Sequence, residues 1–163
     1  TFGGDCIGLA AADATLARYQ EGGVCEHMWR LGGALMEGYN ALALTLGAPT
    51  RMIGQSPHPV IQWEEVPCDD PSALGVLRGE PSHYGVNRHR ASLFFQETVR
   101  RGVLLGPDGN NIILAHSDGD VALTLAACEA AMVEVLSAIG DGKVRERIEG
   151  EPIDPAPAWR VAR

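Results

Sequence analysis

Lysine is almost missing from this sequence: Lys143 is the only one in 163 residues. It lies in the alternating charged stretch 141–147, which offers no desolvated pocket of the kind that activates a nucleophilic lysine. We therefore interpret Lys143 as a surface residue. A reaction that depends on a lysine nucleophile would need one from outside this sequence.

Basic residues are also few, and the net charge is -8. Nucleic acids and anionic membranes bind basic patches, so the charge argues against both as partners. No CxxC pair occurs, and Cys6, Cys25, Cys68 and Cys128 are scattered, which predicts free thiols in a reducing cytoplasm. No apolar run approaches the length of a membrane span, so we expect a cytoplasmic protein without a membrane partner.

No initiator methionine opens the chain, which starts Thr1-Phe2-Gly3-Gly4 and runs straight into an alanine-rich stretch. We expect a piece of a longer polypeptide, since proteins rarely start at a junction between loop and helix. The length suits one domain, or a small domain with an appendage.

The first half of the chain predicts two helices and two strands. Asp5 can cap a helix over 7–19, and Gly22-Gly23 breaks it. A second, long helix carries one apolar stripe, which we expect to cover another domain or subunit: Val24, Met28, Leu31, Leu35, Tyr39, Leu42 and Leu46. Gly47 fits its C-cap, and short strands follow at 51–54 and 60–66.

The second half starts with a long irregular loop, 68–87, of the kind that is often functional. A helix is predicted over 90–101, and a hairpin with strands 103–105 and 112–115 around the turn residues 106–109. Ser117 then caps a helix that ends at Gly140. The tail from Gly150 is proline-rich and irregular. Strands with helices on one face predict an α+β domain.

Several polar residues could suggest a site, but their patterns favour ordinary surface roles. His58, His83, His89 and Cys68 match no zinc spacing, so a metal site is not predicted. The acidic pairs Glu64-Glu65 and Asp69-Asp70 read as solvated side chains rather than acid–base pairs. His116 follows a strand end and precedes a helix cap, a position open to a functional site, but we favour a packing or surface histidine.

Three segments together resemble class III aminotransferases, which are fold-type I enzymes dependent on pyridoxal phosphate (PLP). They are Thr1-Phe2-Gly3-Gly4 with Ala12-Asp13-Ala14-Thr15-Leu16, Gly102-Val103-Leu104-Leu105, and Ala115-His116-Ser117-Asp118. The branch most similar is that of glutamate-1-semialdehyde aminomutase. The resemblance covers roughly residues 1–47 and 90–140.

This resemblance implies a fold and a division of the chain. Residues 1–47 would be two helices from the end of the large domain, and 48–140 the small C-terminal α+β domain, a short antiparallel sheet covered by helices. Residues 141–163 lie outside the resemblance, and their composition predicts a charged, proline-rich tail. The Schiff-base lysine would lie upstream, so the chain alone would be catalytically inactive, with no catalytic residue of its own. The implied partners are the large domain, a second subunit of a homodimer, and a small amino or keto substrate.

The resemblance also implies a cofactor-binding role for Thr1, whose counterpart in the family binds the PLP phosphate of the neighbouring subunit. A hydroxyl and free N–H groups before a helix suit an anion. Asp5 departs from the family pattern, because a carboxylate repels a phosphate unless it turns away to cap the helix. The stretch 110–116 has no arginine to grip a substrate carboxylate, which argues against an ordinary α-amino acid. The alternative is a non-enzymatic α+β dimerisation or binding domain.

Overall fold

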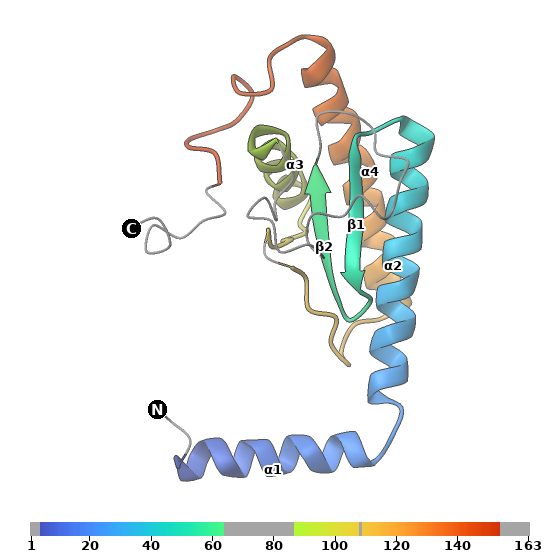
Figure 1. Ribbon diagram of the computed structural model, residues 1–163, viewed down its shortest axis with the longest axis vertical. Coiled ribbons are helices and arrows are strands. Elements are labelled where there is room, and N and C mark those ends of the chain that lie inside the picture. Colours follow the sequence, from blue (N-terminus) through green and yellow to red (C-terminus); the bar gives the residue numbers. More distant parts are fainter. Residues whose placement is uncertain (1–3, 64–86, 108, 154–163) are drawn as a thin grey trace.

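The computed structural model describes residues 4–63, 87–107 and 109–153 (Figure 1). Thr1 and most of the predicted 68–87 loop therefore lie outside the described residues. The elements are α1 (Cys6–Gln20), α2 (Val24–Leu46), β1 (Thr50–Gln55), β2 (His58–Trp63), α3 (Arg88–Arg100) and α4 (Asp118–Gly140). The predicted α+β class is confirmed, with four helices and one two-stranded antiparallel sheet in the described part of the chain.

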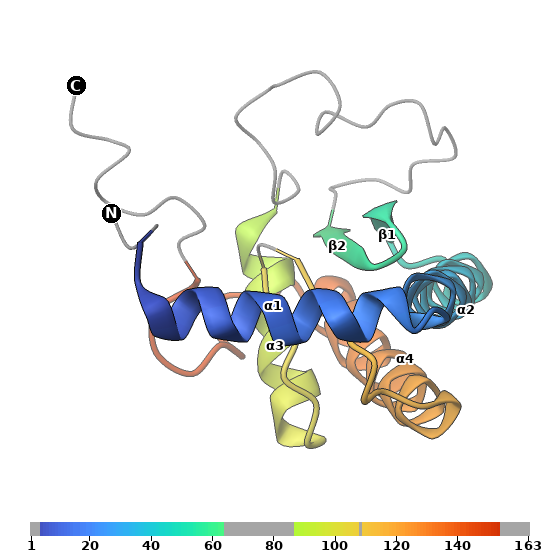
Figure 2. The same cartoon turned by 90° about the horizontal axis from the view of Figure 1, so that it is seen from below.

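Helix α1 stands apart from the rest of the fold, crossing below it (Figures 1 and 2). Its predicted start is confirmed, because the Asp5 carboxylate accepts a hydrogen bond of 2.8 Å from the Gly8 amide. The break is confirmed too: Gly22 and Gly23 take φ angles of 84° and 79°, which glycine adopts without strain. None of the residues of α1 is buried.

Helix α2 carries the predicted stripe, and Gly47 ends it in the left-handed conformation at φ 65°. The stripe residues Val24, Leu31, Leu35 and Tyr39 are buried. They pack within this chain, however, because α2 lies against both α4 and β1. The expectation that this stripe is free to cover another domain is therefore wrong.

The sheet pairs Thr50 with Trp63 at one end and Gln55 with His58 at the turn. Both strands begin and end within a few residues of their predicted positions. Helix α2 is fixed to the outer edge of β1 by Asn40, whose amide donates to the Met52 carbonyl at 2.9 Å and accepts from the Met52 N–H at 2.8 Å. One side chain thereby satisfies two edge groups that would otherwise be open to another strand.

Aromatic rings join the helices to the sheet in the core. The Phe94 ring of α3 lies 5.4 Å from that of Trp63 and 6.0 Å, edge-on, from that of Tyr39. The Thr50 hydroxyl donates to the Gln62 carbonyl at 2.8 Å, so Tyr39 donates its own hydroxyl proton to Thr50 at 2.7 Å. Burial raises the pKa of Tyr39 well above its usual range. The core therefore spans α2, the sheet, α3 and α4.

The predicted division at residue 47 remains a prediction about a longer protein, although α2 shares one core with residues 48–140 here. The start of the tail is also tied down. Ile148 is buried, the Glu149 amide donates to Gln96 of α3 at 2.7 Å, and the Ile153 amide donates to the Ser92 hydroxyl at 2.9 Å.

The predicted hairpin over 103–105 and 112–115 is wrong, because neither segment forms a strand. The second segment turns to the sheet instead. The Asn110 and Ile112 amides donate to the carbonyls of Pro59 and Pro57, both at 2.9 Å. Val103 and Leu105 meanwhile bury their side chains in the core.

Helix α4 begins with a capping box between Ser117 and Asp120, which confirms its predicted start. It buries one side against α2 and α3, through Ala127, Cys128, Ala131, Met132, Val135 and Ala138. The expectation that no apolar run reaches the length of a membrane span is wrong, since an 18-residue window of α4 has a mean hydropathy of 1.7. About a third of that window, 33%, is buried in the fold.

Candidate functional site

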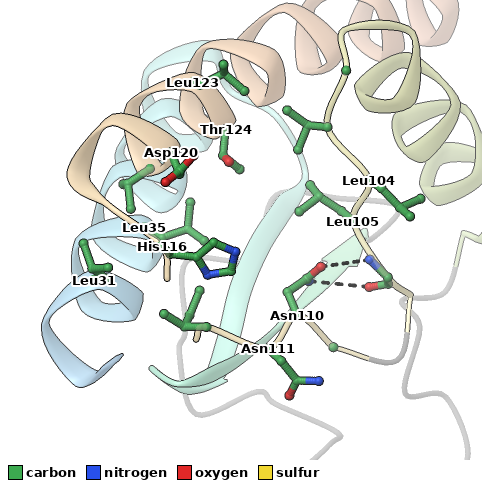
Figure 3. A pocket seen from close by; sticks show the side chains of 16 residues that line it. Leu31, Leu35, Leu104, Leu105, Asn110, Asn111, His116, Asp120, Leu123 and Thr124 are labelled. Atoms are coloured by element: carbon green, nitrogen blue, oxygen red, sulfur yellow. Dashed lines mark hydrogen bonds between the residues drawn. The ribbon is translucent and has the colours of Figure 1, made fainter. Parts of the chain in front are cut away.

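A cavity of about 480 Å³ lies between α2, the segment 102–112 and the first turns of α4 (Figure 3). We call it the His116 cavity. Its apolar wall comes from Leu31 and Leu35 of α2 and from Val103, Leu105 and Ile112. Its polar groups come from Asn110, Asn111, His116, Asp120 and Thr124. Ionisable and apolar side chains meet in this cavity over the core.

His116 is held at the cavity by its own turn and by α2. Its Nδ1 accepts a hydrogen bond of 3.1 Å from the Ile113 amide, so in the neutral ring the proton lies on Nε2. Its backbone carbonyl accepts from His27 Nε2 at 2.9 Å. Figure 3 shows the His116 ring near the centre of the lining residues, with Thr124 above it and Asn110 below. The ring is therefore a fixed donor on the cavity wall.

The first turn of α4 carries two carboxylates that are both engaged. Asp120 accepts from the Ser117 hydroxyl at 2.7 Å and from the Ser117 amide at 2.8 Å, and these bonds lower its pKa. Asp118 forms a bidentate pair with Arg30 of α2, at 2.6 and 3.2 Å. That hydrogen bonding lowers the pKa of Asp118, so both carboxylates are ionised at neutral pH.

The cavity wall formed by the segment 102–112 is attached to the hairpin turn of the sheet. Asn110 closes its own loop by accepting from the Gly106 amide at 2.8 Å. His58 and Asn111 share a hydrogen bond of 2.8 Å between Nδ1 and Oδ1. Gly109 lies so close to this ring that an added Cβ would come 2.3 Å from His58 Nε2, and its φ of 128° also favours glycine.

Thr1, the one predicted site residue, and the polar residues that were considered and set aside are not brought together at this cavity. Thr1 lies outside the described residues, as do His83, Cys68 and both acidic pairs. His89 lies in the first turn of α3 and does not line the cavity. Among the described histidines that were considered from the sequence, His116 lines the cavity and His58 lies next to its residue Gly109.

PLP needs a lysine for its Schiff base, and the described residues do not fit that need. Lys143 is exposed on the turn after α4, where its backbone amide donates to the Ala138 carbonyl at 2.9 Å. It does not line the His116 cavity. The site that the resemblance implies is therefore not formed by the described part of this chain.

The sequence interpretation missed the cavity itself. His116 was expected to be a packing or surface residue, whereas it is half-buried on the cavity wall. The capping box immediately after it was a usable signal, since a fixed helix start also fixes the residue before it. No sequence signal indicated Asn110 or Thr124, because their place depends on contacts between distant segments.

No family model matches the sequence, and no curated protein matches it. The fold matches the FumI protein of Sphingopyxis sp. MTA144, solved in its PLP internal aldimine form, with a TM-score of 0.62 and 25% identity. That match covers 80% of this chain and 27% of the FumI chain. An omega-transaminase from Sphaerobacter thermophilus matches with a TM-score of 0.54 and 16% identity, over 68% of this chain and 24% of that chain. The chain thus spans about a quarter of the length of both structures, and the likeness supports the class III aminotransferase fold predicted from the sequence.

Proposed function

We propose that this chain is the C-terminal part of a PLP-dependent aminotransferase or aminomutase whose lysine-bearing large domain lies upstream. The observation that carries the proposal is the match to FumI, which includes most of this chain but about a quarter of FumI. The exposed position of Lys143 supports it as well, since a Schiff-base lysine lies in a desolvated pocket. On this proposal the chain alone is catalytically inactive.

The finer identity is proposed from the sequence resemblance. The parent belongs to the glutamate-1-semialdehyde aminomutase branch, acts on a small amino or keto compound, and works as a cytoplasmic homodimer. PLP, when bound in the parent, supplies the electron sink for amino-group transfer. The contribution of this chain is Thr1, whose hydroxyl holds the cofactor phosphate across the subunit interface.

Helix α1 supports the proposed partners. A helix of 15 residues with none buried does not gain the packing that stabilises most helices in proteins. Its apolar side chains are open, with Ile7 81% and Leu16 61% exposed. Trp29, near the start of α2, is 52% exposed. We assign this surface to contacts with the upstream large domain and the second subunit.

The test compares this chain with the longer polypeptide read from the upstream coding sequence. The longer protein should take up PLP and show the absorbance of an internal aldimine, whereas the chain alone should not. An upstream sequence without a lysine, or a stable aldimine on Lys143 of the isolated chain, would contradict the proposal. A longer protein that dimerises without taking up PLP would favour the alternative, a non-enzymatic dimerisation domain.

Thr1 is tested by Thr1→Ala in the longer protein. One hydroxyl on a phosphate oxygen is worth about 1.5–3 kcal/mol, so PLP affinity should fall roughly ten- to hundredfold. The matched control is Thr15→Ala, because the Thr15 hydroxyl bonds only within α1, to the Ala11 carbonyl. A mixed dimer of a lysine-less subunit and a Thr1→Ala subunit should recover one intact site. Unchanged affinity in Thr1→Ala would remove Thr1 from the cofactor site.

A further inference from the structure

We propose that the His116 cavity binds a small neutral molecule with an apolar body and one hydroxyl or carbonyl oxygen. The inference goes beyond the proposed function, because it requires neither PLP nor any residue outside this chain. The volume of about 480 Å³ falls within the roughly 300–1,000 Å³ of most small-molecule sites.

The apolar body is matched by the wall opposite α4. Leu31 and Leu35 face the cavity from α2, and Val103 and Leu105 face it from the segment after α3. These four side chains also belong to the buried core, so the wall is held in place whether or not a ligand is present. An apolar group that enters the cavity would lie over this wall and displace water from the exposed side chains of Leu104 and Leu123.

Two polar side chains at the start of α4, His116 and Thr124, can form hydrogen bonds to the oxygen of the ligand. His116 directs its accepting Nδ1 to the Ile113 amide, which leaves the Nε2 proton free to donate. The Thr124 hydroxyl has no hydrogen-bond partner among the described residues and can donate or accept. Each of them can bind a hydroxyl or carbonyl oxygen.

The charges around the cavity disfavour an anion, and an ammonium group would have to lose its hydration to enter. A bare helix N-terminus attracts anions, but Asp120 and Asp118 already compensate that of α4. Asp120 is the only carboxylate among the described lining residues, and Ser117 donates two hydrogen bonds to one of its oxygens, Oδ2. No arginine or lysine is among the described residues that line the cavity.

The test uses this chain and three probes that share a benzyl or phenyl ring: benzyl alcohol, benzylamine and benzoate. Amide chemical shifts of Val121 and Thr124 would be followed by NMR during each titration. Saturable shifts with benzyl alcohol, and binding at least tenfold weaker for benzoate and for benzylamine, would support the proposal. Binding of either charged probe as tight as that of the alcohol, or no saturable shift with the alcohol, would overturn it.

Two substitutions locate the binding. Thr124→Val keeps the shape but removes the hydroxyl, and should weaken benzyl alcohol about two- to tenfold. Its matched control is Thr45→Val, whose hydroxyl lies on the exposed side of α2 and bonds the Ala41 carbonyl. Val121→Phe should fill the cavity and abolish binding. If Thr124→Val and Thr45→Val bind the alcohol equally, or a folded Val121→Phe binds it unchanged, the site is elsewhere.

Discussion

Two neighbouring glycines of α2 should respond in opposite ways to alanine. At Gly32 an added Cβ would lie 1.7 Å from the Ser56 carbonyl oxygen, so the helix and the hairpin turn would have to separate by more than an ångström. At Gly33 the nearest atom is the Ser56 hydroxyl, at 3.9 Å, an ordinary contact. Each substitution also gains the helix propensity of alanine over glycine, about 1 kcal/mol. Comparing the two variants therefore separates the cost of the clash between α2 and Ser56 from the gain in helix propensity.

Overpacking typically costs about 1–3 kcal/mol, and the Gly32 clash is with backbone, which moves least easily. We expect Gly32→Ala to lose about 2 kcal/mol of unfolding free energy and Gly33→Ala to gain about 1. At roughly 2–4 °C per kcal/mol for a chain of this size, the midpoints should differ by about 6–12 °C. Thermal and urea unfolding followed by circular dichroism would measure this. A Gly32→Ala protein as stable as Gly33→Ala would refute the close approach of α2 to the turn.

Three further predictions follow from the same packing. Burial raises the pKa of the Cys128 thiol to about 12. A thiol reagent at pH 8 should therefore label the exposed Cys6 and Cys25 quickly, and Cys128 only on unfolding. Equal labelling rates for the three thiols would contradict the burial of this face of α4. Burial of Glu97 favours its neutral form, but hydrogen bonds from Arg101, Gln96 and Arg100 outweigh this and lower its pKa. The ionised Glu97 carboxylate therefore stabilises the fold above its unfolded-state pKa, and this stabilisation is lost as the pH falls through its folded-state pKa. Glu97→Gln should lower the unfolding free energy by about 1.5–3 kcal/mol at neutral pH. In acid, the unfolding free energies of the variant and the parent chain should become equal. Deleting residues 1–22 removes α1 without removing any described buried residue, so the shortened protein should stay folded. It should self-associate less than the full chain in sedimentation velocity, because the exposed apolar side chains of α1 are gone. Equal self-association of the two proteins would show that α1 is not the contact surface.

The sequence predicted those features that depend on neighbours along the chain. Asp5, Gly23, Gly47 and Ser117 act within one helical turn of their own position, and each begins or ends the helix it was expected to bound. The apolar stripe of α2 was also right, because a period near 3.6 identifies one face without naming what covers it.

What covers that face could not be predicted, and the same limit explains the failed hairpin. The turn residues 106–109 favour a reversal, but a reversal specifies no partner for the strands on either side. Asn110 and Ile112 find their acceptors at Pro59 and Pro57, more than fifty residues earlier in the sequence. The His116 cavity was missed for this reason, since its walls come from three separate segments.

The hairpin turn of the sheet connects these separate contacts. Pro59 has no N–H, and it lies in a strand whose outer edge could pair with another chain. Its carbonyl and that of Pro57 both accept hydrogen bonds from the segment 110–112, so the chain itself covers the start of this edge. The other side of the turn meets α2 at Gly32 through the backbone of Ser56. The turn is therefore fixed from both sides, and because it anchors the segment 110–112, a perturbation at Gly32 should reach the cavity wall without any lining residue being changed.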